Sequence, residues 1–265
     1  MERTLGHRLR VRRRGVSLAG RSPGTVGSSS QTAREDPGSH SGKSPGHSEE
    51  LRGLLIVLGI LVLTILVSLL VKKDKSLYIL GYIVAIVYVM RGPRRNNRPW
   101  SEVGIKPPRS FLEDLKKVWY LVLIVVFIFQ FLAPEMGVAH LLGYYQLLVH
   151  YINARVSQVP GLAGAALILS LFETIVYQVF VQERLSWFIG TPAAIVLASV
   201  LAGFAHAASA GWGTFNVAFT DAAGVVLDFA VFGIIWARTR NLAVTWAAHY
   251  AADITGIIAL TLIFR

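Results

Sequence analysis

The chain has 265 residues, of which 54% are hydrophobic and 15% are charged. Because soluble domains carry roughly 25% charged residues, this composition predicts a protein that crosses a membrane several times. The absence of cysteine excludes disulfides and thiolate metal sites. The formal net charge of +11 is typical of Lys and Arg that face anionic membrane lipids. The chain shows no basic surface motif interleaved with aromatic residues, so we expect no nucleic-acid partner.

Residues 1–50 differ in composition from the rest of the chain, being rich in Arg, Ser, Gly and Pro. Such a segment cannot bury enough apolar surface to offset the entropy of ordering it, so we expect a disordered basic tail. Residues 51–265 are expected to form one transmembrane domain, with residues 160–264 as its motif-bearing core.

Long apolar runs in the remaining sequence predict membrane spans. The predicted spans are residues 54–71, 77–90, 118–133, 162–188, 193–210, 215–236 and 242–264. Residues 137–159 are less apolar and fit either a short span or a helix in the interface, which gives roughly seven or eight helices. Between the second and third spans, prolines and glycines predict a basic loop over 91–110, followed by an amphipathic segment at 111–117. The predicted fold is therefore an all-α, polytopic helix bundle, integral to the cell membrane and surrounded by its lipids.

Among the ionisable residues inside these apolar runs, four are the main candidates for a site: Glu173, His206, His249 and Asp253. A charge at the centre of a bilayer costs at least ~2.5–3.5 kcal/mol, so such residues usually face the interior of a bundle and mark a site. His249 and Asp253 are four apart and share one helix face. The small alanines around them suit close approach of neighbouring helices.

Three further polar residues are expected to support this site. Thr174 and Gln178 follow Glu173 on nearly the same arc of its helix, and Asp228 lies deep in the run 215–236. Asp228 is expected to act behind the primary groups or to pair with a histidine.

These residue types allow two routes to hydrolysis of an acyl bond. A carboxylate and a histidine can activate a water, while a second histidine stabilises the developing oxyanion. Alternatively, Glu173, His206 and His249 suffice to bind a divalent metal such as zinc, which lowers the pKa of its bound water. The sequence leaves both routes open.

At these residues the sequence resembles the CPBP group of intramembrane proteases, which includes the type II CAAX prenyl endopeptidases and the abortive-infection-like proteins. Glu173 matches the first glutamate of the motif Glu-Glu-x-x-x-Arg, and His206 matches the histidine of Phe-x-x-x-His. His249 and Asp253 match a third motif, His-x-x-x-Asn or His-x-x-x-Asp. The resemblance implies that Glu173 and His206 activate water, and that His249 and Asp253 orient the substrate carbonyl.

The chain departs from the family pattern at four positions. Thr174 stands where the second glutamate is expected, Gln178 where arginine is expected, Val179 where glycine is common, and Ala202 where the motif phenylalanine is expected. Losing a glutamate and an arginine together removes a potential ion pair and leaves neither charge without its partner, which is consistent with a variant site.

We therefore expect an intramembrane endopeptidase that cleaves a membrane-associated protein or peptide. Two other functions remain compatible with the sequence. Chains of buried acids and histidines also serve proton-coupled transporters, and an inactive immunity or scaffold protein could share the fold.

Overall fold

The computed structural model describes residues 47–71, 75–95, 100–132, 159–210 and 215–263. The predicted tail falls almost wholly outside these residues, as does the ambiguous segment 137–159 apart from its last residue. All regular structure in the described ranges is helical. The predicted all-α fold is therefore confirmed.

Seven continuous helices make up the described part of the bundle, together with a 3₁₀ turn, η1 (Trp100–Val103). Two of them contain π-helical segments: α3 runs into η2, and α7 continues through η4 into α8. The elements are α1 (His47–Val71), α2 (Lys75–Arg95), α3 (Ser110–Leu123), η2 (Ile124–Leu132), α7 (Val159–Glu173), η4 (Thr174–Gln182), α8 (Glu183–Ile189), α9 (Thr191–Ala210), α10 (Phe215–Thr239) and α11 (Leu242–Ile263).

Several helix ends differ from the sequence-based boundaries, and α1 and α2 are two clear cases. α1 begins at His47, before the predicted end of the tail at residue 50. Its first turn contains Glu49 and Glu50, and carboxylates stabilise a helix N-terminus through the helix dipole. α2 continues to Arg95, although the predicted basic loop began at Arg91. The apolar run in the sequence therefore ends before α2 ends.

Glycine and proline separate α8 from α9 as the sequence predicts. Gly190 has a φ of 80°, a left-handed value that glycine adopts without steric cost, and its N–H donates to the Ser186 carbonyl. Pro192 follows in the first turn of α9, where a missing N–H costs nothing. Pro160 likewise lies in the first turn of α7 and does not precede the helix.

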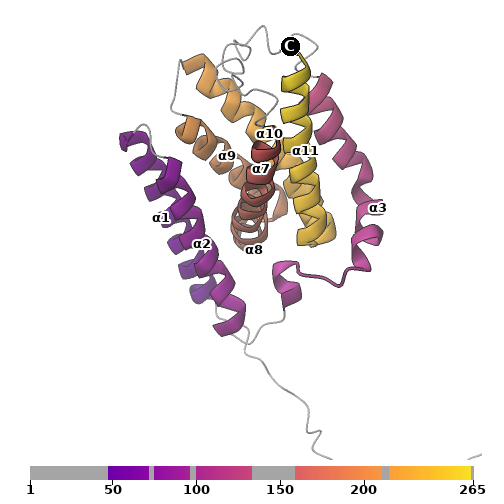
Figure 1. The fold of residues 1–265 in the computed structure, drawn as a ribbon. Helices are drawn as coiled ribbons and strands as arrows, with labels where there is room; N and C mark the ends of the chain where they lie inside the picture. Colours follow the sequence, from indigo (N-terminus) through magenta and orange to yellow (C-terminus); the bar gives the residue numbers. More distant parts are fainter. Residues whose placement is uncertain (1–46, 72–74, 96–99, 133–158, 211–214, 264–265) are drawn as a thin grey trace, which may run out of the picture. The chain divides into compact units, whose positions relative to one another are not determined.

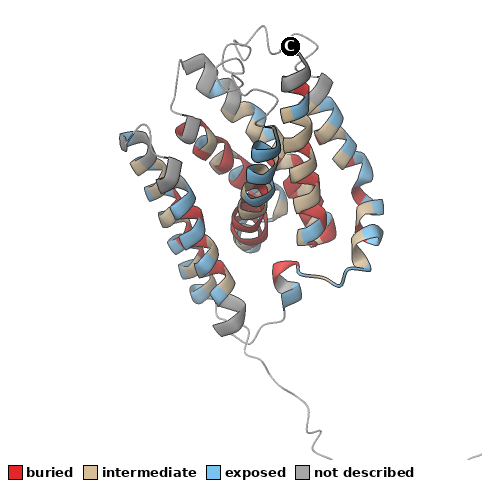
Figure 2. Ribbon diagram, viewed as in Figure 1, coloured by how far each residue is buried: buried red, intermediate tan, exposed pale blue. Residues whose placement is uncertain are grey.

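The helix formed by α7, η4 and α8 occupies the centre of the bundle in Figure 1. Its η4 segment contacts α1, α2, α9, α10 and α11. Every residue of η4 is buried, and the central helix is mostly red around this level in Figure 2. A polar residue placed here is therefore removed from lipid and can meet groups from several helices.

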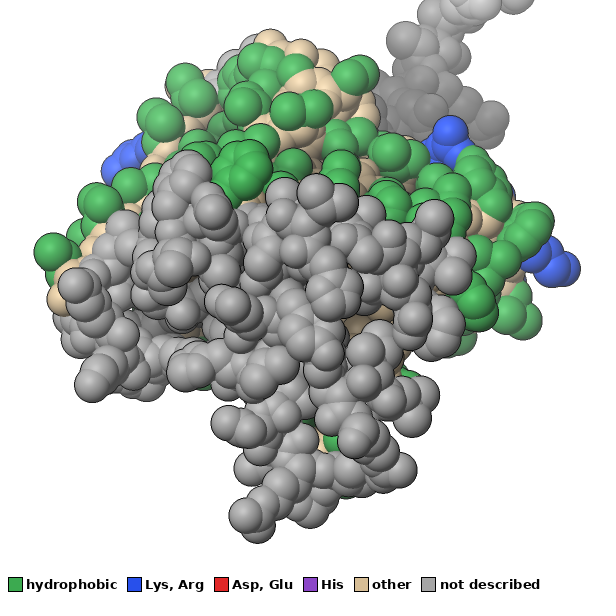
Figure 3. Space-filling model, turned by 90° about the horizontal axis from the view of Figure 1, so that it is seen from above, with side chains coloured by type: hydrophobic (Ala, Val, Ile, Leu, Met, Phe, Trp, Pro, Cys, Tyr) green, Lys and Arg blue, Asp and Glu red, His purple; other side chains and the backbone are tan. Residues whose placement is uncertain are grey.

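The outside of the bundle is apolar. In the described part of the chain, five helices are long and apolar enough to cross a membrane: Ser48–Val67, Val159–Ile189, Thr191–Ala208, Ala222–Thr239 and Leu242–Ala259. Large side chains such as Leu63, Leu70 and Phe219 are more than half exposed. The coloured surface in Figure 3 is correspondingly dominated by hydrophobic side chains, with basic ones at its margin. A contiguous apolar exterior of this kind identifies an integral membrane protein.

Candidate active site

Glu173 is the last residue of α7, where the helix changes from α to π geometry. It is 8% exposed, so the carboxylate points into the bundle and away from lipid. The following η4 segment is rich in β-branched residues, which crowd the turns of an α-helix. The wider π turn gives them more room, and π-helical turns are frequent at functional sites.

The imidazole of His249 lies between two carboxylates. Its Nε2 is 3.6 Å from Glu173 Oε2 and 3.8 Å from Asp253 Oδ1. The His249 side chain is 4% exposed and that of Glu173 11%, whereas Asp253 is 35% exposed and is the most accessible of the three. Both separations are slightly longer than a direct hydrogen bond and match polar groups that share a water.

Thr174 contacts the other nitrogen of the same ring. Its Oγ1 is 3.2 Å from His249 Nδ1 and donates to the Ser170 carbonyl at 2.7 Å. Thr174 is fully buried. The threonine that replaces the second motif glutamate is therefore part of the site.

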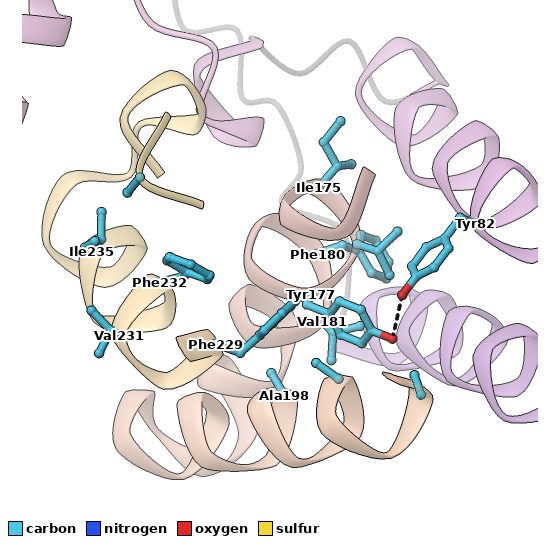
Figure 4. Close-up of a cluster of buried hydrophobic side chains, with 14 of the residues drawn as sticks. Tyr82, Ile175, Tyr177, Phe180, Val181, Ala198, Phe229, Val231, Phe232 and Ile235 are labelled. Atoms are coloured by element: carbon cyan, nitrogen blue, oxygen red, sulfur yellow. Dashed lines mark hydrogen bonds between the residues drawn. The ribbon is translucent and has the colours of Figure 1, made fainter. Parts of the chain in front are cut away.

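Two phenylalanines of α10 hold the His249 ring in place. Phe232 stacks on it with ring centroids 4.4 Å apart, and Phe229 meets it edge-on at 5.1 Å. Phe229 also packs edge-on against Tyr177 of η4, whose hydroxyl accepts a hydrogen bond from Tyr82 of α2 at 3.1 Å. Figure 4 shows this apolar cluster, in which side chains of α2, η4 and α10 meet.

His206 lies in α9 and is partly buried. It interacts electrostatically with Glu173, Asp228, His249 and Asp253, so the second-motif histidine shares the neighbourhood of the other predicted site residues. Glu173, His206, His249 and Asp253 come from three different helices, α7, α9 and α11.

Close packing of α9 on α10 brings His206 towards this neighbourhood. A Cβ on Gly203 would lie 2.6 Å from Val226 Cγ2 and 2.7 Å from the Ala222 carbonyl oxygen. Ala202 is buried on this helix, whereas Phe204 is 55% exposed. The only phenylalanine near the expected motif position therefore faces outwards and does not replace the missing one.

Asp228 belongs to the same electrostatic cluster through His206 and Asp253. Its Oδ2 accepts a hydrogen bond from Gln130 Nε2 of η2 at 2.7 Å. Its buried Oδ1 has no hydrogen-bond partner among the described residues, and neither has Oε1 of Gln178. Gln178 is 1% exposed, so an amide fills the buried position where the family pattern has an arginine.

A metal ion would need several side-chain ligands from this site. Within the described residues, no three or more His, Cys, Asp or Glu side chains are arranged to hold one. Binding of a metal by Glu173, His206 and His249 remains a sequence-based expectation.

Three contributors were not singled out in the sequence: Gln130, Phe229 and Phe232. Gln130 is an amide in an otherwise apolar run, a signal of the kind that marked the ionisable residues. Phe229 and Phe232 are three apart, so their shared face was readable. Their contact with His249 was not, because it depends on how α10 packs against α11.

Comparison with known proteins agrees with the motifs. Residues 155–255 match the family model described as Type II CAAX prenyl endopeptidase Rce1-like. No curated protein and no solved structure matches the chain. The matched region contains Glu173, His206, His249 and Asp253 in the expected order, and the family is one of proteases. Over residues 155–255 the chain is therefore similar to the type II CAAX prenyl endopeptidase Rce1-like family.

Proposed function

We propose that the protein is an intramembrane endopeptidase that hydrolyses a peptide bond of a membrane-associated protein or peptide. The observation that carries the proposal is the position of the Glu173 carboxylate, which is buried and 3.6 Å from an imidazole nitrogen of His249. A buried carboxylate beside an imidazole can hold a water and take its proton. The family match supports a peptide bond as the substrate.

In the proposed reaction, the oxygen of a water held at Glu173 attacks the carbonyl carbon of the peptide bond. Glu173 takes one proton of this water, and His206, which interacts electrostatically with Glu173, is proposed to help hold it. The proton then passes to the amine nitrogen as the C–N bond breaks, which regenerates the carboxylate. The site lies within helices of membrane-spanning length, so the substrate has to reach it from the lipid.

Convergence of the polar groups favours hydrolysis over proton transport. A transporter needs titratable groups spaced along a water path. Here the carboxylates of Glu173 and Asp253 both lie within 4 Å of Nε2 of His249. Side chains that converge on one point in this way suit a reaction of a single bound molecule.

The test is cleavage of quenched-fluorescent peptides by the full chain in proteoliposomes. One peptide carries a farnesylated CAAX-type C-terminus and the other is an unprenylated single-span peptide, so the two separate the substrate classes. Glu173→Gln and His206→Ala are each expected to lower the cleavage rate by at least about 100-fold, because general acid–base groups contribute that much or more. Glu113→Gln, which changes an exposed carboxylate of α3, serves as the control.

Undiminished cleavage by both variants would refute the assignment of these residues. Absence of cleavage by the unmodified protein with either peptide would favour the inactive-scaffold alternative. Metal analysis of the purified protein, together with cleavage in the presence of a chelator, separates the zinc route from the metal-free one.

A further inference from the structure

Among the described residues, the hydroxyl of Thr174 has two polar neighbours, and it has one hydrogen to donate. The Ser170 carbonyl, 2.7 Å away, has no hydrogen to give, so the hydroxyl donates to it. The oxygen of Thr174 is then free only to accept, and its second neighbour is His249 Nδ1 at 3.2 Å. Nδ1 must therefore carry a hydrogen.

The surroundings of His249 leave little freedom for another arrangement. Phe232 stacks on the ring and Phe229 meets it edge-on, so the ring plane is fixed by apolar contacts. A neutral imidazole with a hydrogen on Nδ1 has its lone pair on Nε2. That lone pair faces Oε2 of Glu173 and Oδ1 of Asp253, which are acceptors when the carboxyl groups are ionised.

We infer that Thr174 is a positioning residue: it holds His249 as the Nδ1–H tautomer, so that the gap between His249 and Glu173 takes a hydrogen-bond donor. A water beside these two atoms can meet this need, because its two hydrogens can point at Nε2 and at Oε2. A carbonyl oxygen does not fit, because it would meet only acceptors, with Asp253 Oδ1 as a third. The inference rests on the proposed function, since the water oriented here is the one that reacts.

This assignment changes the role that the family resemblance implies for His249. In place of donating to the substrate carbonyl, Nε2 accepts one hydrogen of the water while Glu173 takes the other as the proton of the reaction. It also gives the threonine at the second motif position a function. Its hydroxyl is neutral and its hydrogen is committed to Ser170, so it can only accept from the ring.

The tautomer can be observed directly. Histidine-selective ¹⁵N labelling of the full chain in lipid nanodiscs distinguishes a protonated ring nitrogen from an unprotonated one, and loss of the signal in His249→Gln assigns it. At neutral pH we expect His249 to show a protonated Nδ1 and an unprotonated Nε2. Thr174→Ser should preserve this pattern, and Thr174→Val, which has the same shape without the hydroxyl, should give a mixture of tautomers.

Cleavage of the peptides supplies the second readout. Thr174→Val is expected to lower kcat roughly 10- to 100-fold, as is usual when the partner that fixes the tautomer of a working histidine is removed. KM should change little, because Thr174 lies behind the imidazole and does not meet substrate. Thr174→Ser should retain most of the activity.

Three outcomes decide the matter. A hydrogen on Nε2 instead of Nδ1 in the unmodified protein overturns the inference whatever the activity. An unchanged tautomer and kcat in Thr174→Val overturns the role of Thr174. A tautomer that depends on Thr174 in a protein that cleaves neither peptide upholds the hydrogen-bond assignment and overturns the proposed function, so the two failures are distinguishable.

Discussion

Asp114 lies in α3 with its side chain 4% exposed and receives polar contacts from three residues. Lys117 Nζ is 2.6 Å from Oδ1, while Lys106 Nζ and Asn241 Nδ2 are each 3.1 Å from Oδ2. Asn241 in turn accepts from the first N–H groups of α11 and so caps that helix. The sequence predicted an amphipathic segment at residues 111–117. It gave no sign that Asp114 in this segment joins α3 to the start of α11.

The pKa of Asp114 shows the effect of these partners. Burial alone would raise it, but hydrogen bonds from Lys117, Asn241 and Lys106 outweigh burial and lower the pKa from 3.8 to about 2. A carboxyl group with a lowered pKa in the folded state stabilises the fold above its unfolded pKa. We therefore expect this contribution to be complete above about pH 4 and to be lost as the pH falls to about 2.

Asp114→Asn should lower the free energy of unfolding at neutral pH by about 2 kcal/mol, the usual value of hydrogen bonds to a charged group. The same variant should lose the part of the acid sensitivity that lies between about pH 4 and pH 2. Thermal unfolding in detergent, followed by tryptophan fluorescence, measures both effects. Glu113→Gln changes the exposed neighbouring carboxylate and should match the unmodified protein; an equal loss in both variants would contradict the assignment.

At the scale of helices, the contact of α9 with α10 depends on one small residue. Gly203 leaves no room for a methyl group, because Val226 and the backbone of Ala222 lie against it. Small residues at such crossings allow helix backbones to approach closely in membrane proteins. This crossing lies one turn from His206 and sets how near α9 comes to the site.

Gly203→Ala should therefore destabilise the bundle by about 1–3 kcal/mol, the usual cost of overpacking. It should also reduce cleavage, because the α9 backbone must move away from α10 and take His206 with it. Gly224→Ala is the matched control, since an added Cβ there meets nothing within 4 Å. Thermal unfolding in detergent and the peptide assay measure the two effects, and equal behaviour of both variants would show that the crossing tolerates a methyl group.

The two π-helical segments could not be predicted from the sequence. An apolar run that is hydrophobic on all sides gives no periodic signal from which the turn width can be read. The residues of η2 and η4 were therefore assigned simply to spans. The change from α-helical to π-helical geometry at Thr174 is seen only in the structure, where η4 packs against α9, α10 and α11.

At the scale of the whole molecule, residues 44–265 form one compact unit, and every contact described above lies inside it. A chain that begins at Ser44 should keep the thermal stability of the full protein and cleave both peptides at a similar rate. Thermal unfolding and the proteoliposome assay on the shortened chain test this. A large loss of stability would show that residues 1–43 contribute to the fold.

The candidate site could be predicted from the sequence, because charged and imidazole groups in apolar helices are costly and therefore conspicuous. Glu173, His206, His249 and Asp253 stood out for this reason. Gln130 and Phe232 did not, because an amide or an aromatic ring in a membrane helix has many ordinary explanations.

The sequence by itself determined that the protein is an all-α membrane bundle, because long apolar runs fix both helix formation and insertion locally. It also predicted which residues carry the chemistry, a prediction that cleavage by the variants tests. Only the tertiary structure decided that Thr174 contacts Nδ1 of His249 and that Nε2 faces Glu173 and Asp253. The contact between Thr174 and His249 joins residues 75 positions apart. Such contacts depend on the packing of one helix against another, which the period of a single helix does not encode.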